Sequence, residues 1–131
     1  MSEESREVRH YTDRVMVLGK PMCLEAVLFD HQLSLLLYGG DAPHIGSAAV
    51  LSPDGSISVQ TFPGHREDVI CSAWAKALLQ AGWKAAVISA GIHYDGLDRA
   101  GIRTVLDEAD AILQRFLKKT ADFEANEIPP L

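Results

Sequence analysis

The sequence has few cysteines, a shortage of basic residues and no long apolar run, and each shortage excludes a class of protein. Cys23 and Cys71 are the only cysteines, too few and too widely spaced for a disulfide framework or a CxxC metal clip. Lysine and arginine number 12 against 18 aspartates and glutamates, a formal net charge of −6, which would repel nucleic acid. No apolar run approaches the roughly 20 residues that span a bilayer, and the polar, acidic start does not resemble a secretion signal. We therefore expect a cytoplasmic protein whose partners include neither nucleic acid nor membrane.

The composition that remains is that of one small folded domain. The chain has 131 residues, of which 47% are hydrophobic and 23% charged, an ordinary globular balance for a single core. We expect residues 1–119 to form this domain. Residues 120–131 have no apolar period and are expected to form a C-terminal tail.

Apolar periodicity predicts five to six strands and two helices. The expected strands are residues 7–18, 22–29, 33–38, 48–51, 57–62 and 84–90. Helical spacing begins at Glu67 and stops near Gly82, and a second helix is expected from an Asp98 cap to about Lys118 and Lys119. Short links make antiparallel hairpins of the second and third strands and of the fourth and fifth. The pattern predicts an α/β (α+β) fold with a mixed, mostly antiparallel sheet.

Three loops share one design, in which an apolar strand is followed by glycine and then by a histidine near a carboxylate. They are GGDAPH (39–44), PGHRED (63–68) and GIHYD (91–95). Following the strand directions through the hairpins and a right-handed crossover places His44, His65 and His93 at one edge of the sheet. Both helices begin at this edge, and Arg66 adds donors that match phosphate oxygens. The edge is therefore a candidate site for an anionic ligand.

The chemistry of this edge leaves alternatives open. His44, His65, His93, Asp41, Asp68 and Asp95 are candidates to bind a divalent metal, a phosphate, or a phosphate through a metal. Any single histidine is more readily explained as a solvated loop residue or a helix cap. The spacing matches no closed metal signature such as HExxH, and the glycines form neither GxGxxG nor a P-loop.

The motifs GGDAPHIG (39–46), PGHRED (63–68) and GIHYDG (91–96) resemble the small D subunit of gallate and hydroxyaryl-acid decarboxylases. That subunit is a prenylated-flavin chaperone domain similar to proteasome assembly chaperones, and the resemblance covers most of residues 33–116. It implies a sheet with two helices packed on one face, and a homodimer. It also implies a non-catalytic accessory protein that binds prenylated FMN or FMN and supports the maturation of a prenylated-FMN-dependent aromatic acid decarboxylase.

The loop chemistry and the resemblance together predict a set of site residues. Those expected to contact the cofactor are Gly40, Asp41, His44, Gly64, His65, Arg66, His93 and Asp95. Those expected to hold a divalent metal are His44, His65, His93 and Asp68. The chain departs from the family pattern at Arg66, where relatives usually have lysine, and at the start of the second helix, residues 96–101.

Two other classes of function fit the same residues. A small metal-dependent enzyme would use the histidine-bound metal to activate water, with Asp68 or Asp95 as the base. A protein-only assembly chaperone would bind partners through the tail or a sheet edge. Flavin absorbance retained after desalting separates the flavin-binding chaperone from the protein-only one, and elemental analysis tests for the metal.

Overall fold

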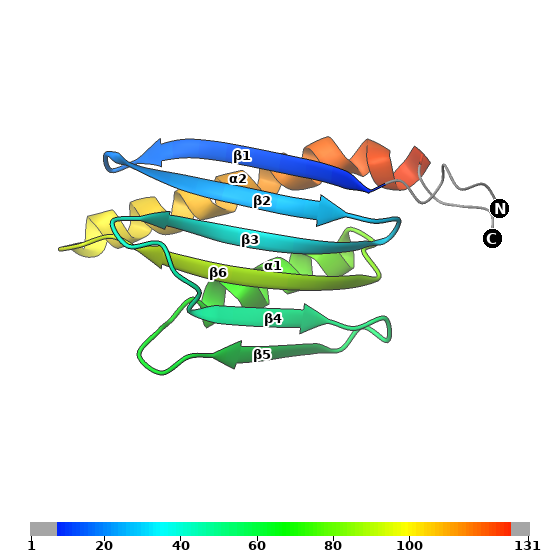
Figure 1. The fold of residues 1–131 in the computed structure, drawn as a ribbon, viewed down its shortest axis with the longest axis horizontal. Coiled ribbons are helices and arrows are strands. Elements are labelled where there is room, and N and C mark those ends of the chain that lie inside the picture. The colour runs from blue at the N-terminus through cyan, green and yellow to red at the C-terminus, as the bar shows by residue number, and fades with distance from the viewer. Residues whose placement is uncertain (1–7, 127–131) are drawn as a thin grey trace.

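The computed structural model describes residues 8–126 and contains one six-stranded mixed sheet with two helices (Figure 1). The strands are β1 (Arg9–Val17), β2 (Lys20–Leu28), β3 (Gln32–Gly40), β4 (Ser47–Leu51), β5 (Ile57–Thr61) and β6 (Ala85–His93). The helices are α1 (Asp68–Gln80) and α2 (Arg99–Asn126). The sheet order is β1-β2-β3-β6-β4-β5, with only β3 and β6 paired in parallel. The predicted fold class, a mixed and mostly antiparallel sheet with two helices on one face, is confirmed.

One face of the sheet carries the core. Alternate residues of the central strands are buried, with Leu35, Leu37 and Ile88 at most 1% exposed, and they pack in one core with buried helix residues such as Leu78 and Phe116. Both helices lie behind the sheet in Figure 1, α1 over β4, β5 and β6 and α2 reaching β1. Buried and exposed residues therefore alternate along these strands, because both helices cover the same face of the sheet.

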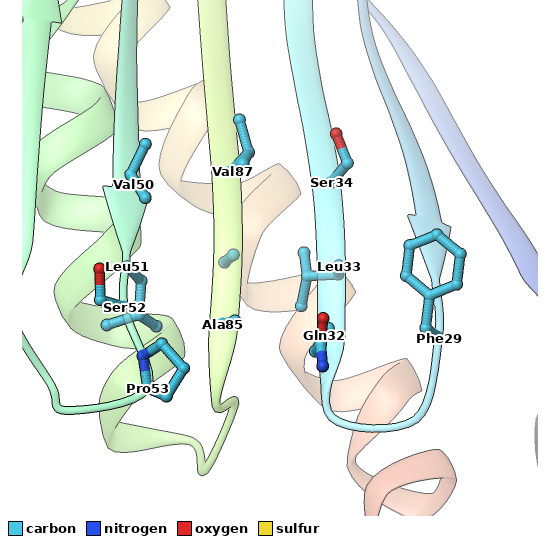
Figure 2. A pocket seen from close by; sticks show the side chains of 11 residues that line it. Phe29, Gln32, Leu33, Ser34, Val50, Leu51, Ser52, Pro53, Ala85 and Val87 are labelled. Carbon is cyan, nitrogen blue, oxygen red and sulfur yellow. The ribbon is translucent and has the colours of Figure 1, made fainter.

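The other face of the sheet is covered by no helix of residues 8–126. Val87 and Val50, on adjacent strands, are 43% and 42% exposed. Figure 2 shows their side chains and that of Ser34 on the near side of the sheet, with the helices behind. Apolar side chains are therefore exposed on the face of the sheet that lies opposite the helices.

Strand direction brings several chain reversals to one end of the sheet, which we call the histidine edge. The arrowheads of β3, β5 and β6 point the same way in Figure 1, so the loops 41–46, 62–67 and 94–98 leave from this edge. Both helices begin there, as predicted, while the turn at Pro53 lies at the opposite edge. The β1–β2 turn, Leu18 and Gly19, also reaches the histidine edge, which we did not predict.

The ends of β3, β6 and α2 lie beyond the residues that the sequence predicted. β3 and β6 continue through Gly40 and His93, because these residues are partners in the parallel ladder where the glycines had indicated loops. Helix α2 does not end near Lys119 but continues to Asn126. Thr120 is 1% exposed and donates its hydroxyl to the carbonyl of Phe116 at 2.7 Å, so a polar residue continues the buried stripe. Residues 127–131 of the expected tail lie outside the described residues.

The start of α2 is as predicted. Asp98 Oδ1 accepts the backbone N–H of Gly101 at 2.8 Å, the geometry of an N-cap. No helix within residues 8–126 is both long and apolar enough to cross a membrane.

Candidate functional site

Two imidazoles and one carboxylate converge at the histidine edge. His44 comes from the β3–β4 loop, His65 from the β5–α1 loop, and Glu67 immediately precedes α1. His44 Nε2 lies 2.6 Å from Glu67 Oε2, and His65 Nδ1 lies 3.7 Å from Glu67 Oε1. One potential ligand atom from each residue lies within 4.8 Å of the other two. We call these three residues the metal cluster, because their donor atoms match those of a divalent metal site.

Glu67 is held in place by the backbone around it. The residue is 7% exposed. Its Oε1 accepts the N–H of Arg66 at 3.1 Å and its Oε2 accepts the N–H of Ile92 at 3.2 Å. Because a buried carboxylate needs such partners, these bonds fix its orientation toward the histidines.

Two glycines allow the loops to approach each other. A Cβ atom at Gly91 would lie 1.6 Å from the carbonyl oxygen of His44, so only glycine lets the β3–β4 loop cross β6 here. A Cβ atom at Gly46 would lie 2.6 Å from both carboxylate oxygens of Glu67. The positions of His44 and Glu67 therefore depend on the absence of two side chains.

The hydrogen bonding of His44 favours metal binding. Its Nδ1 donates to the carbonyl of Ala42 at 2.9 Å, so the neutral ring carries its lone pair on Nε2. Nε2 is buried and faces Glu67 Oε2 without hydrogen-bond alignment to it or to any other described atom. With the ring neutral, the Nε2 lone pair and the carboxylate oxygen at 2.6 Å repel each other unless a cation, either a proton or a metal ion, is bound there, and a backbone bond at the other ring nitrogen is how metal-bound histidines are oriented.

His93, Asp41 and Asp95 form a network at the same edge that shares no residue with the metal cluster. His93 Nε2 lies 2.8 Å from Asp95 Oδ1, and the N–H of Asp95 donates to Asp41 Oδ2 at 2.9 Å. Lys20 Nζ is 3.8 Å from Asp41 Oδ1. The side chains of His93 and Asp95 are 53% and 76% exposed, so they stand in solvent at the rim of the edge.

The predicted metal ligands are thus only partly brought together. His44 and His65 belong to the metal cluster, whereas neither His93 nor Asp68 contributes an atom to it. Glu67 was not among the predicted ligands; its neighbour Asp68 was, and that residue lies in the first turn of α1. The motif PGHRED contains both carboxylates, and nothing in its spacing distinguishes the one that faces the histidines.

The remaining predicted residues lie around the cluster. Gly40 pairs with His93 in the ladder, and Gly64 precedes His65 with φ of +84°. Arg66 is exposed and lines a pocket next to the cluster. Cys71 lies on α1, where burial raises the pKa of its thiol to about 11. The thiol therefore stays protonated at neutral pH and donates to Ser47 O, rather than binding metal.

The pocket beside the metal cluster has a volume of about 510 Å³. It lies between the first turns of the helices and the end of β6, and Glu67 is part of its wall. Its apolar lining is Val69, Ile70, Ile92, Tyr94, Leu97, Ile102, Val105 and Leu106. This pocket was not predicted from the sequence.

A family model described as the prenylated flavin chaperone LpdD-like domain matches residues 19–121. This chain belongs to that family. The matched range contains all three histidine motifs and the metal cluster, and it confirms the resemblance inferred from those motifs. Because the family is a chaperone domain, it agrees with our expectation of an accessory protein rather than an enzyme.

The fold is also similar to a solved structure. A chain from the crystal structure of a novel chaperone complex for yeast 20S proteasome assembly matches with a TM-score of 0.52 and 12% sequence identity. The match covers 93% of this chain and 98% of that one. At this identity the similarity establishes the fold alone. A comparison with curated protein sequences gives no significant match.

Proposed function

We propose that this protein binds prenylated FMN, or FMN, at the histidine edge and delivers it to a prenylated-FMN-dependent decarboxylase of aromatic acids. Membership of the prenylated flavin chaperone family supports the flavin as the ligand. The decarboxylase is proposed as the recipient because prenylated FMN is the cofactor that such enzymes need.

The phosphate group is proposed to bind through a divalent metal held by His44, His65 and Glu67. The single observation that carries this proposal is the buried Nε2 of His44, which faces Glu67 at 2.6 Å without a hydrogen bond. A divalent ion with three protein ligands supplies positive charge and an open coordination position for a phosphate oxygen. His44 and His65 come from loops that follow different strands, so the site forms only in the folded chain.

The charge of the molecule favours a metal at this site. The chain carries a formal charge of −6, and a phosphate group approaching a buried carboxylate would be repelled. A metal at the cluster removes that repulsion. Arg66 lies next to Glu67 and adds a guanidinium group, and the amino terminus of α1 directs its dipole to the same place.

Asp41, His93 and Asp95 remain candidates for contacts with polar parts of the ligand. Their network is exposed and stands at the same edge. Exposed hydrogen-bonding groups suit the ribityl hydroxyls of a flavin, which are themselves donors and acceptors.

The open face of the sheet is proposed to pair with a second copy of the chain. Strands are about 4.8 Å apart and rise about 3.3 Å per residue, so the face covers roughly 700 Å². A stable dimer buries about 800 Å² on each partner. On this face β3, β6, β4 and β5 present Leu36, Val87, Ala48, Val50 and mainly uncharged polar residues, while β1 and β2 add the charged residues Arg14 and Glu25.

Flavin retention tests the proposed function. Protein stripped of metal is incubated with FMN, with or without zinc, and desalted, and the flavin absorbance of the protein fraction is measured. We expect flavin to be retained only with zinc, and His44→Ala to abolish retention. His10→Ala, which removes an exposed imidazole from β1, is the matched control and should retain flavin. The wild type is also incubated with prenylated FMN. If it retains neither FMN nor prenylated FMN, the proposal is wrong.

A further inference from the structure

The pocket between the first turns of α1 and α2 is lined mostly by apolar side chains. Its aliphatic side chains come from both helices and from the end of β6, and only Arg66 and Glu67 bring charge to the wall. Tyr94 also lines it, but the tyrosine hydroxyl donates to the carbonyl of Lys20 at 3.2 Å. The pocket therefore suits an apolar group.

The apolar lining reaches solvent at the mouth of the pocket. Val69 and Ile102 are 58% and 49% exposed, and they lie near the beginnings of different helices. Large exposed aliphatic residues on two sides of one cavity are typical of a binding surface. A volume of about 510 Å³ falls within the range of pockets that enclose cofactor-sized molecules.

The pocket and the metal cluster share a wall. Glu67 contacts His44 and His65 through its carboxylate, and the same residue lines the pocket. A ligand with an anionic group at the cluster therefore has the pocket directly beside it. The arrangement fits a molecule with a phosphate at one end and a hydrocarbon-rich ring system at the other.

We propose that this pocket holds the dimethylbenzene edge and the prenyl-derived ring of the bound flavin, and that the chaperone thereby selects prenylated FMN over FMN. The assignment rests on the proposed function, since it takes flavin as the ligand. The hydrocarbon that prenylation adds would be removed from water when it enters the pocket. Burying these extra carbon atoms in an apolar site should raise the affinity for prenylated FMN over FMN by about tenfold or more.

The test compares two ligands and two variants. Val69→Gln combined with Ile102→Gln makes the mouth polar without adding charge, and glutamine is a good helix former. Leu79→Gln is the matched control, because Leu79 is 39% exposed on α1 and does not line the pocket. Each protein is titrated anaerobically with prenylated FMN and with FMN in the presence of zinc. Inorganic phosphate is used as a competitor to report on the cluster.

We expect the wild type and Leu79→Gln to bind prenylated FMN about tenfold or more tightly than FMN. The double variant should lose this preference, with competition by inorganic phosphate unchanged. If the wild type binds both flavins equally, or if the double variant keeps the preference, the pocket assignment is wrong while the proposed function stands. If the wild type binds neither flavin, the proposed function itself fails.

Discussion

Among single residues, Glu67 has the most contacts that matter to the site. It accepts two backbone N–H groups, from Arg66 and Ile92, and faces both histidines of the metal cluster. We therefore expect its charge to affect metal binding and its two acceptor oxygens to affect the stability of the fold.

Glu67→Gln is expected to lower zinc affinity by about 10-fold to 100-fold or more, because the charged ligand is lost. It should also lower the free energy of unfolding by about 1–3 kcal/mol, because one backbone N–H loses its acceptor. Zinc titration and urea unfolding measure the two effects. Asp107→Asn removes an exposed carboxylate from α2 and should change neither. Unchanged zinc affinity in Glu67→Gln would exclude this residue as a ligand.

Cys71 predicts how stability depends on pH. Burial raises the pKa of its thiol from 9.0 to about 11, so above pH 9 the unfolded chain loses this proton before the folded one does. The free energy of unfolding contributed by the thiol is therefore complete below pH 9 and decreases as the pH rises toward 11. Urea unfolding between pH 8 and pH 10 should show a steeper decline in the wild type than in Cys71→Ala. Parallel declines would contradict the assignment.

At the scale of elements, the crossing of the β3–β4 loop over β6 positions the site. Gly91 permits this crossing, because any Cβ atom there would overlap the carbonyl of His44. The loop then brings His44 to Glu67, and Gly46 leaves room for the carboxylate. The site thus depends on contact between two backbones.

Gly91→Ala is expected to displace the loop and to cost about 2–3 kcal/mol or more of unfolding free energy, since backbone must move to relieve the overlap. Zinc binding should weaken at the same time. Gly19→Ala is the control: Gly19 has φ of +81°, and a Cβ atom added there would meet no atom within 4 Å, so its cost is limited to about 1–2 kcal/mol of backbone strain. Equal losses in both variants would show that the crossing has no special role.

The elements also show which features the sequence could predict. The Pro53 turn and the short links forced antiparallel pairing, and the crossover fixed the direction of β6, so the histidine edge followed from topology. The choice between Glu67 and Asp68 did not follow, because neighbouring residues at a helix start point about 100° apart and the periodicity begins only after them. His93 lies apart from the cluster because β6 continues past Gly91 as far as His93. The sequence predicted that this strand ends before Gly91, because glycine is typical of a loop.

For the whole molecule, the uncovered sheet face predicts the oligomeric state. We expect the wild type to sediment as a dimer. Val87→Lys places a charge on β6 at the centre of that face and should give a monomer with an intact far-ultraviolet spectrum. Leu79→Lys, on the exposed side of α1, should remain dimeric. Dimers in all three proteins, or a monomeric wild type, would rule out this face as the interface.

The metal cluster and the flavin phosphate can be located together in a crystal structure of the protein with zinc and FMN, collected at the zinc absorption edge. We predict one anomalous peak at about 2.0–2.2 Å from ligand atoms of His44, His65 and Glu67, with a phosphate oxygen of FMN in a remaining coordination position. Zinc bound elsewhere, or FMN whose phosphate lies away from these three residues, would contradict the proposed site.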